Sequence, residues 1–329
     1  MRVFVTGGAG FIGSHFARSV LTDKYPYLAG AEVTVFDKLT YAGNLANLES
    51  AAGNPRYRFV QGDICRPADL DAALPGHDVV VNFAAESHVD RSVSGGASEF
   101  VRTNVVGAQQ VLDAALRHRV QTVVQVSTDE VYGSIESGSW REDHLLQPNS
   151  PYAASKAGAD LVARSYAVTY GLDVRITRCS NNYGPYQFPE KVIPLFITNL
   201  LDGLSVPLYG VGTNVRDWLF VGDHCHALAL VMEHGAPGEV YNIGGGRELS
   251  NRALTELLLD ATGRNWSSVE EIVDPRGPAH DLRYSVDHSK IAALGYQPRT
   301  KFEDGLARTV DWFRDNRDWW APLRARAAF

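Results

Sequence analysis

Short apolar runs alternate with helically spaced apolar positions through the first half of the chain. Runs rich in β-branched residues predict strands at residues 2–6, 32–36, 56–60, 78–83, 122–127 and 174–177. Apolar side chains at three- and four-residue steps predict helices at residues 11–21, 99–118 and 151–170. Near-continuous apolar strands between helices indicate right-handed βαβ units and a parallel sheet that is covered on both faces. We therefore expect an α/β protein with a doubly wound parallel sheet, the Rossmann arrangement.

The pattern changes after about residue 178. Prolines and glycines become frequent at 181–191 and 274–281, strands shorten, and the predicted helices are separated by loops at 222–233, 251–261 and 303–315. We predict a first domain at residues 1–178 and a smaller mixed α/β domain mainly at 179–329. Segments around 217–246 and the C-terminal helix are expected to return to the first domain. No flexible linker separates the two parts, so a ligand is expected in the cleft between them.

Composition restricts the classes of partner. The chain has 329 residues, with 31 Lys and Arg against 38 Asp and Glu, and a formal charge of −7. This negative balance argues against nucleic acid or an anionic membrane as a partner held by long-range attraction. The cysteines Cys65, Cys179 and Cys225 are widely spaced, which favours neither a disulfide framework nor a metal cluster, so we expect no metal and a cytoplasmic protein.

A glycine-rich turn follows the first predicted strand. Gly7, Gly10 and Gly13 stand within GGAGFIG, where the strand ends and a helix begins. Glycines at such a turn allow close approach of a pyrophosphate, which then lies at the helix N-terminus. Asp37 ends the second strand, where a carboxylate accepts hydrogen bonds from a ribose and repels a 2′-phosphate. NAD is therefore the expected cofactor, in preference to NADP, although a plain glycine turn is the alternative.

A tyrosine and a lysine one helical turn apart form a second candidate site. Ser150 and Pro151 predict a helix N-terminus, which places Tyr152 and Lys156 on one face. An ammonium close to a phenol lowers the pKa of the phenol, so we expect Tyr152 to accept a proton from a substrate hydroxyl. The alternative is two unrelated surface residues.

With these motifs the chain resembles the extended short-chain dehydrogenase/reductase family, and within it the dTDP-glucose 4,6-dehydratases. TDEVYG at residues 128–133 carries the closest part of the resemblance. Further matching strings lie at residues 37–48, 84–92, 151–160, 180–196 and 216–224. The chain departs from the family pattern at 274–281, where extra residues surround Arg276 and His280.

The resemblance implies a reaction that needs two carboxyl groups. NAD would oxidise C4 of the glucose unit of dTDP-glucose, water would be eliminated across C5 and C6, and hydride would return to C6. By the same resemblance Asp129 is the acid, Glu130 is the base at C5, and Thr128 lies beside Tyr152 at the C4 oxygen. A UDP-sugar 4-epimerase and a non-catalytic NAD sensor are the competing readings. Neither needs the Asp129–Glu130 pair.

The resemblance also implies the remaining contacts and an assembly. The expected cofactor contacts are Gly7, Gly10, Phe11, Ile12, Gly13, Asp37, Lys38, Leu39, Thr40, Asp63, Ile64, Phe83, Ala84, Ala85, Ser87, Thr103, Tyr152, Lys156 and Asn182. The expected substrate contacts are Ser87, Thr128, Asp129, Glu130, Asn181, Lys191, Val192, Pro207, Tyr209, Arg216, Asn251, Arg276, His280 and Tyr284. Relatives pair the helices at 99–118 and 151–170 in a four-helix bundle, so a homodimer is expected.

Overall fold

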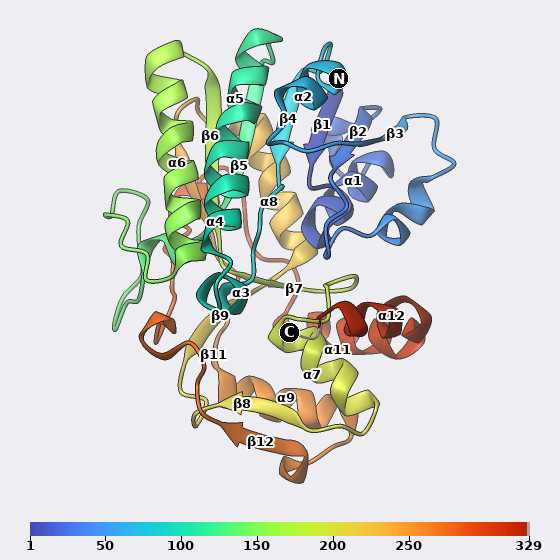
Figure 1. The fold of residues 1–329 in the computed structure, drawn as a ribbon, viewed down its shortest axis with the longest axis vertical. Coiled ribbons are helices and arrows are strands. Elements are labelled where there is room, and N and C mark those ends of the chain that lie inside the picture. Colours follow the sequence, from blue (N-terminus) through green and yellow to red (C-terminus); the bar gives the residue numbers. More distant parts are fainter. Residues whose placement is uncertain (328–329) are drawn as a thin grey trace.

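The structure is a computed structural model that describes residues 1–327, and a seven-stranded parallel sheet forms its centre (Figure 1). The strand order is β10-β6-β5-β4-β1-β2-β3, so the chain winds outward in both directions from β1. This confirms the predicted doubly wound sheet. The strands are β1 (Arg2–Thr6), β2 (Glu32–Asp37), β3 (Tyr57–Gln61), β4 (Val79–Asn82), β5 (Thr122–Thr128), β6 (Asp173–Cys179) and β10 (Val240–Ile243).

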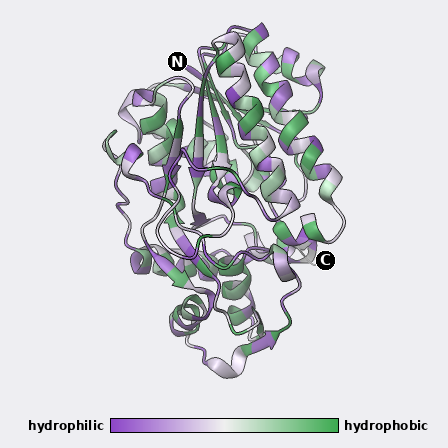
Figure 2. Ribbon diagram, turned by 90° about the vertical axis from the view of Figure 1, so that its left-hand side faces the viewer, coloured by the Kyte–Doolittle hydropathy of each residue, from purple (hydrophilic) through white to green (hydrophobic). Residues whose placement is uncertain are grey.

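Helices cover both faces of this sheet, and each face has its own apolar core. On one face α1 (Phe11–Leu21) and α8 (Val221–His234) pack on Val3, Val33 and Val124. On the other face α2 (Pro67–Ala73), α5 (Ala108–Arg117) and α6 (Pro151–Tyr170) pack on the alternate positions Phe4 and Val123. Because both faces of the sheet are covered, its inner strands are mainly hydrophobic while the helices have mixed surfaces (Figure 2).

The helix beside the cleft is less regular than its spacing predicts. The expected helix at 99–118 consists of α4 (Ala97–Phe100), a π-helical segment η3 (Val101–Gly107) and α5. The π segment carries the buried Asn104, whose Oδ1 accepts from the Glu86 amide at 2.8 Å. Its Nδ2 donates to the Glu86 carbonyl at 3.0 Å and to the Ser155 hydroxyl at 2.8 Å. Asn104 thus joins this helix to α6 and to the loop that follows β4.

The smaller lobe combines short sheets with helices. Strands β11 (Glu248–Ser250), β9 (Val215–Phe220) and β7 (Asn181–Tyr183) form one sheet, and β8 (Val206–Tyr209) pairs with β12 (Val269–Ile272). Helices α7 (Val192–Leu201), α9 (Asn251–Thr262), α11 (Phe302–Asp315) and α12 (Arg317–Ala327) pack around them. Short segments complete the fold: α3 (Val89–Val93), α10 (Ser289–Ala292), η1 (Pro26–Leu28), η2 (Leu45–Ala51), η4 (Asp129–Tyr132), η5 (Trp266–Ser268) and η6 (Gly277–Ala279).

Part of the second half of the chain lies with the first lobe. Strand β10 and helix α8, both from the stretch 217–246, belong to the central sheet and its cover. The C-terminal helices α11 and α12 bury Phe302, Leu306, Phe313 and Trp320 in the core of the smaller lobe, while the Trp319 indole donates to Asn47 of the first lobe at 3.0 Å. Their apolar stripes meet α7 and β9 rather than the central sheet. The domain boundary at 178 stays a prediction.

A buried ion pair supports the turn that follows β5. The Arg178 Nε donates to Asp160 on α6 at 2.9 Å, and one of its amino groups donates to the Tyr132 hydroxyl at 2.7 Å. The side chains of Arg178 and Asp160 are 6% and 1% exposed. Tyr132 ends η4 and donates in turn to Asn242 of β10 at 2.8 Å.

Replacing Arg178 with methionine is expected to destabilise the fold. Arg178→Met leaves the Asp160 carboxylate buried without its cation, which typically costs about 3 kcal/mol. Urea unfolding measures the loss. The matched control, Arg175→Met, removes another arginine of β6, whose side chain pairs with the less buried Asp173. Equal stability of Arg178→Met and the unaltered protein would contradict the expectation.

Candidate active site

A cavity of about 850 Å³ opens at the carboxyl ends of the central strands and extends to the smaller lobe. Ligands of doubly wound α/β proteins bind at this edge of the sheet. The structure brings nearly the whole predicted set together here: Gly7, Gly10, Phe11, Ile12, Gly13, Asp37, Lys38, Thr40, Asp63, Ile64, Phe83, Ala84, Ala85, Ser87, Thr103, Thr128, Asp129, Glu130, Tyr152, Lys156, Asn181, Asn182, Lys191, Val192, Pro207, Tyr209, Arg216, Asn251, Arg276 and His280.

Two predicted site residues lie behind the cavity wall. Leu39 packs its side chain against the core of the first lobe, while its amide donates to the Asp37 carboxylate at 2.8 Å. Tyr284 is 4% exposed, and its hydroxyl donates to Asp281 at 2.7 Å. The Arg216 guanidinium lies 4.2 Å above the Tyr284 ring. Tyr284 therefore supports Arg216 in this structure, and its expected substrate contact stays a prediction.

The glycine turn packs so closely against the backbone around it that a side chain at Gly7 or Gly13 would collide. Gly7 has a φ of +64°, and a Cβ there would lie 2.6 Å from the Ala84 nitrogen. A Cβ on Gly13 would lie 2.5 Å from the carbonyl oxygen of Gly7. No side chain caps the N-terminus of α1, so its first amides face the cavity. A pyrophosphate fits this cradle, because helix N-terminal amides stabilise negative charge.

Asp37 lies at the end of β2 beside this cradle. Its carboxylate accepts hydrogen bonds from the amides of Ala9 at 2.9 Å and Leu39 at 2.8 Å. Burial raises the pKa of Asp37, while these two hydrogen bonds lower it. Carboxylate oxygens have further lone pairs, which fits acceptance from ribose hydroxyls. Asp63, by contrast, is paired with the Lys38 ammonium at 2.9 Å, and its expected adenine contact stays a prediction.

Two carboxyl groups follow β5 on a short turn. Thr128 begins η4, and its hydroxyl oxygen accepts from the Glu130 amide at 3.3 Å. This cap turns Asp129 and Glu130 into the cavity directly after the strand. Asp129 is 2% exposed, and its Oδ2 has no hydrogen-bond partner among residues 1–327. A buried oxygen without a protein partner at a cavity wall is suited to contact a ligand.

The surroundings raise the pKa of both carboxyls for different reasons. Burial, then the neighbouring Glu130 and Asp217, raise the pKa of Asp129 well above its ordinary value. Burial also raises the pKa of Glu130, but the Arg216 and Lys191 cations oppose this effect. Asp129 therefore keeps a proton more readily than Glu130. A difference of this kind is what an acid and a base in adjacent positions require.

Burial dominates the electrostatics of the Tyr152–Lys156 pair. The Lys156 ammonium donates to the Val126 carbonyl at 2.7 Å, and burial lowers the pKa of Lys156. Burial and the Glu130 carboxylate raise the pKa of Tyr152 well above its ordinary value. In the ligand-free protein burial thus outweighs any lowering of the Tyr152 pKa, and the expected effect of Lys156 stays a prediction. The helix face is as predicted, because both residues line the cavity.

Cationic groups from the smaller lobe face these residues across the cavity. The Lys191 ammonium donates to the Ser87 carbonyl at 2.5 Å. The amino groups of Arg216 donate to the carbonyls of Val215 at 2.7 Å and Asp281 at 2.8 Å. Backbone carbonyls thus hold both Lys191 and Arg216 in place.

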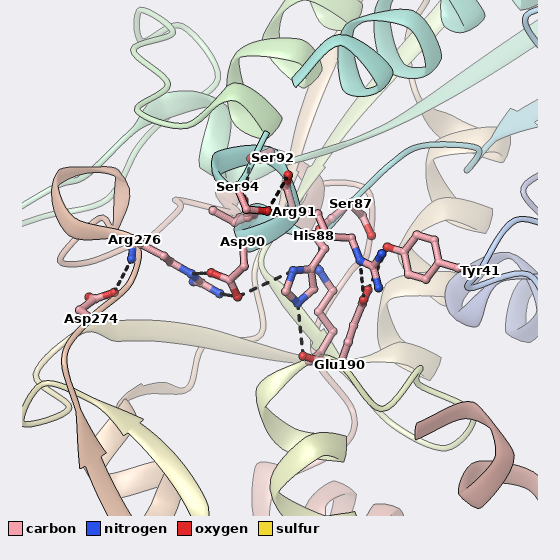
Figure 3. Close-up of polar contacts among 12 residues, drawn as sticks. Tyr41, Ser87, His88, Asp90, Arg91, Ser92, Ser94, Glu190, Asp274 and Arg276 are labelled. Carbon is pink, nitrogen blue, oxygen red and sulfur yellow. Dashed lines mark hydrogen bonds and ion pairs between the residues drawn. The ribbon is translucent and has the colours of Figure 1, made fainter. Parts of the chain in front are cut away.

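The extra residues around 274–281 bring further charged groups to this wall. The Arg276 Nε and one of its amino groups donate to the two Asp90 carboxylate oxygens at 2.5 and 3.0 Å (Figure 3). The His280 Nδ1 lies 2.5 Å from the Asp274 carboxylate. Within the part of the chain that the structure describes, no group of three or more His, Cys, Asp or Glu side chains is arranged to hold a metal ion.

The structure adds wall residues that the motifs did not indicate. Trp218 lines the cavity, and its indole nitrogen is buried without a hydrogen-bond partner among the described residues. In the same region the Asn181 Oδ1 is likewise buried, and Asn181 stands beside Trp218 in the register of β7 and β9. Glu190 also lines the wall, directly before Lys191. Glu190 and Trp218 lie within matching strings, but a string match does not distinguish cavity residues from core.

Asparagine in place of Asp129 is expected to stabilise the fold while it removes the acid. A carboxyl whose pKa is raised by folding makes the protein less stable as pH rises from about 4 through the raised value. Asp129→Asn removes this loss, with an expected gain of about 1 kcal/mol at neutral pH. Thermal unfolding of both proteins at several pH values measures it. The control Asp143→Asn removes an exposed carboxyl, and a stability difference that does not grow with pH would contradict the assignment.

Fold and site together define an NAD-dependent enzyme with an acid–base centre, of the extended short-chain dehydrogenase/reductase type. Residues 4–309 match the family model described as GDP-mannose 4,6 dehydratase. A dTDP-glucose 4,6-dehydratase from an Actinoplanes species is 58% identical over 97% of this chain and 100% of its own length. The chain belongs to this dehydratase family, and its relatives of high identity are dTDP-glucose 4,6-dehydratases.

Solved structures agree with this assignment. A dTDP-glucose 4,6-dehydratase from Streptomyces venezuelae, solved with NAD, is 61% identical, with a TM-score of 0.96 over 98% of this chain and 100% of that chain. A UDP-glucose 4-epimerase from Thermus thermophilus, also solved with NAD, is 31% identical, with a TM-score of 0.86 over 96% of this chain and 100% of that chain. The dehydratase is thus the closer match of these two in sequence and in structure.

Proposed function

We propose that the chain is a dTDP-glucose 4,6-dehydratase, an NAD-dependent hydro-lyase that forms dTDP-4-keto-6-deoxyglucose. The observation that carries this proposal is the adjacent pair of a buried Asp129 and a half-buried Glu130, which lines the same cavity as Thr128 and Tyr152. Removal of water from a sugar needs one acid and one base on neighbouring carbons. The carboxyl pair supplies both.

Tyr152 and Thr128 act at the C4 oxygen of the sugar. When bound, NAD accepts the hydrogen and two electrons of C4 and later returns them at C6, and its positive ring favours ionisation of a nearby phenol. Tyr152 takes the proton of the C4 hydroxyl as C4 becomes a ketone. The Thr128 hydroxyl, already at the N-terminus of η4, donates to the same oxygen and holds its position.

Glu130 and Asp129 divide the elimination between them. The C4 ketone acidifies the hydrogen on C5, and the Glu130 carboxylate removes it as a proton. Asp129 gives its proton to the C6 hydroxyl, which leaves as water. Glu130 later returns a proton to C5, and the proton that Tyr152 took from C4 balances the one that Asp129 gave. Activity therefore needs a pH above the pKa of Glu130 and below that of Asp129.

The smaller lobe binds the nucleotide. Arg216 and Lys191 hold the diphosphate, because a guanidinium and an ammonium on one wall complement two phosphates. Asn181 contributes a buried amide oxygen without a partner among residues 1–327. The remaining predicted contacts from this lobe are Val192, Pro207, Tyr209, Asn251, Arg276 and His280, and all of them line the cavity.

The competing reading is a UDP-sugar 4-epimerase. An epimerase also oxidises C4, but it returns hydrogen to C4 and leaves the C5 and C6 bonds unchanged. It has no use for a protonated Asp129 beside a basic Glu130. The raised pKa of Asp129, set by burial and Glu130, supports the dehydratase reading instead.

Turnover of dTDP-glucose in deuterated water tests the proposal. Deuterium is expected at C5 of a 4-keto-6-deoxy product, because Glu130 exchanges its proton with solvent. NMR and mass spectrometry of the product measure it. Turnover of a UDP-sugar with inversion at C4, without any product from dTDP-glucose, would contradict the proposal.

We also propose a homodimer that uses the surface of α5, η3 and α6. Large apolar side chains are exposed there, among them Val101 at 51%, Leu161 at 60% and Val168 at 71%. Two copies of this helical pair form a four-helix bundle that covers them. A monomeric mass at micromolar concentration in light scattering would contradict this assembly.

A cytoplasmic location is part of the proposal. Cys65, Cys179 and Cys225 are all free thiols, which suits a reducing compartment. Across residues 1–327 no helix is both long and apolar enough to span a bilayer.

A further inference from the structure

One buried carboxylate joins three parts of the cavity wall without a role in the proposed chemistry. The side chain of Glu190 is 2% exposed. Its Oε1 accepts a hydrogen bond from the Tyr41 hydroxyl at 3.0 Å, and its Oε2 accepts one from the Arg91 Nε at 3.3 Å. The Arg91 guanidinium also lies 4.0 Å above the Tyr41 ring. These three side chains are called the Glu190 bridge (Figure 3).

The Glu190 bridge connects the cofactor side of the cavity to the substrate side. Tyr41 lies in the loop that follows Asp37, and the Asn44 amide ties this loop to the glycine turn through the Ala9 carbonyl at 3.1 Å. Glu190 stands just before α7 in the smaller lobe. All three bridge residues line the same cavity as Gly10 and Asp37. The bridge therefore crosses from one wall of the dinucleotide site to the other.

A second set of contacts runs beside the bridge in the same direction. Burial and the Lys191 ammonium lower the pKa of His88 to about 3, so its ring is neutral at physiological pH. The His88 Nε2 lies 3.3 Å from the Glu190 carbonyl, to which it donates. The Lys191 ammonium donates to the Ser87 carbonyl at 2.5 Å. Ser87, His88 and Arg91 thus all contact the adjacent residues Glu190 and Lys191 of the opposite wall.

The bonding pattern makes the bridge sensitive to small changes. The Glu190 carboxylate is almost fully buried, so each of its oxygens depends on a donor from the protein. Removing the Tyr41 hydroxyl leaves one of them without its donor. Hydrogen bonds to a buried charge are among the stronger ones in proteins. Loss of the Tyr41 hydroxyl oxygen alone should therefore make it easier for Tyr41 and Glu190 to separate and for the cavity to open between them.

We propose that the Glu190 bridge is a latch that slows release of the dinucleotide, so that one bound NAD serves successive turnovers. The proposal rests on the proposed function, in which the cofactor is reduced and reoxidised within one turnover. Loss of reduced cofactor after the first step would leave a C4 ketone that has no source of hydrogen for C6. Tyr41, Arg91 and Glu190 touch no reacting atom, so they act as positioning residues.

Release of NAD from Tyr41→Phe tests the latch. The purified protein is saturated with NAD, freed of excess, and diluted into a scavenging enzyme that consumes released NAD. Release is expected to be about tenfold faster than from the unaltered protein, since a lost hydrogen bond to a charge is worth at least 1.4 kcal/mol. The control Tyr27→Phe alters a tyrosine that is 38% exposed and outside the cavity wall, and its release rate should not change.

Two further variants distinguish a specific effect on NAD release from a general loss of stability or activity. Glu190→Gln breaks the ion pair with Arg91 and should release NAD faster still, while Arg91→Lys keeps the charge and should have a smaller effect. For all three variants KM for NAD is expected to rise more than kcat falls. The unfolding temperature of the NAD-free protein should stay within a few degrees of the original. A folded Tyr41→Phe protein with unchanged release, or with a fall in kcat and no change in KM, would overturn the proposal.

The release measurement contains no sugar nucleotide, so it does not depend on the dehydration. If the unaltered protein releases NAD slowly and Tyr41→Phe releases it quickly, the latch stands even where dTDP-glucose is not consumed. In that case only the proposed function fails. If dTDP-glucose is dehydrated and all variants release NAD equally, only the latch fails. The two proposals are therefore tested separately.

Discussion

Glu130→Gln is expected to stop the reaction after its first step. Glutamine has nearly the same shape as glutamate but no basicity, so the hydrogen on C5 stays in place. General-base catalysis typically contributes up to about 10⁴-fold, and we expect a fall in kcat of that order. Oxidation at C4 does not use Glu130, so reduced cofactor should accumulate. Absorbance at 340 nm in a stopped-flow single turnover should rise and remain high.

A control variant is needed to show that loss of a negative charge near this turn does not by itself stop the reaction. Glu136→Gln removes an exposed carboxylate six residues further along the chain and should turn over normally. Normal turnover by Glu130→Gln would remove the base assignment. A loss of the initial absorbance rise would instead place Glu130 at the C4 oxidation.

Tyr152→Phe is expected to slow the first step itself, by about 10³-fold. The ring that packs edge-on against Phe100 at 6.2 Å remains, so the local packing should hold. Only the hydroxyl that takes the C4 proton is lost. The rate of NADH appearance in a single turnover with dTDP-glucose measures the effect.

A second tyrosine on the same helix serves as the control, because it loses the same hydroxyl at a position away from the cavity. Tyr170→Phe alters a ring that is 57% exposed at the end of α6 and should leave the first step unchanged. A Tyr152→Phe protein with an unchanged rate of NADH appearance would remove Tyr152 from the chemistry. Thr128 would then be the remaining group at the C4 oxygen.

Local sequence signals predicted most of the first lobe. The helix α6 begins and ends at the predicted residues, because Ser150 caps its first turn with a 3.1 Å bond to the Ala153 amide and Gly171 takes a φ of +67° at its end. The inner strands are mostly apolar because both of their faces are buried. Such signals depend only on near neighbours in the chain, so they can be recognised without the fold.

The smaller lobe was predicted less completely. Helix α7 was missed because it is apolar around most of its surface and lies directly after a proline-rich stretch, so no amphipathic period is visible. Strands β7 and β11 have three residues each, too few for an alternating pattern. The position of the C-terminal helices also depends on partners far along the chain.

For the candidate site residues, the sequence did not indicate which groups surround each side chain or how far each lies from the cavity. The spacing of Tyr152 and Lys156 correctly placed both at the cavity, but it carried no information about the Val126 carbonyl that holds the lysine. Tyr284 lies under the Arg216 guanidinium, a contact that its sequence neighbours did not indicate, and its expected contact with the nucleotide stays a prediction.

The completion of the central sheet by β10 has a consequence for synthesis of the chain. A ribosome that has produced residues 1–178 has made six of the seven strands but neither β10 nor α8. The part of the sheet face that α8 covers, with Val124 and Val126 of β5, is then open to water. The nascent chain must emerge to about residue 243 before this face can be buried. The first lobe therefore finishes folding only after much of the second has left the ribosome, and chaperones have an apolar surface to bind until then.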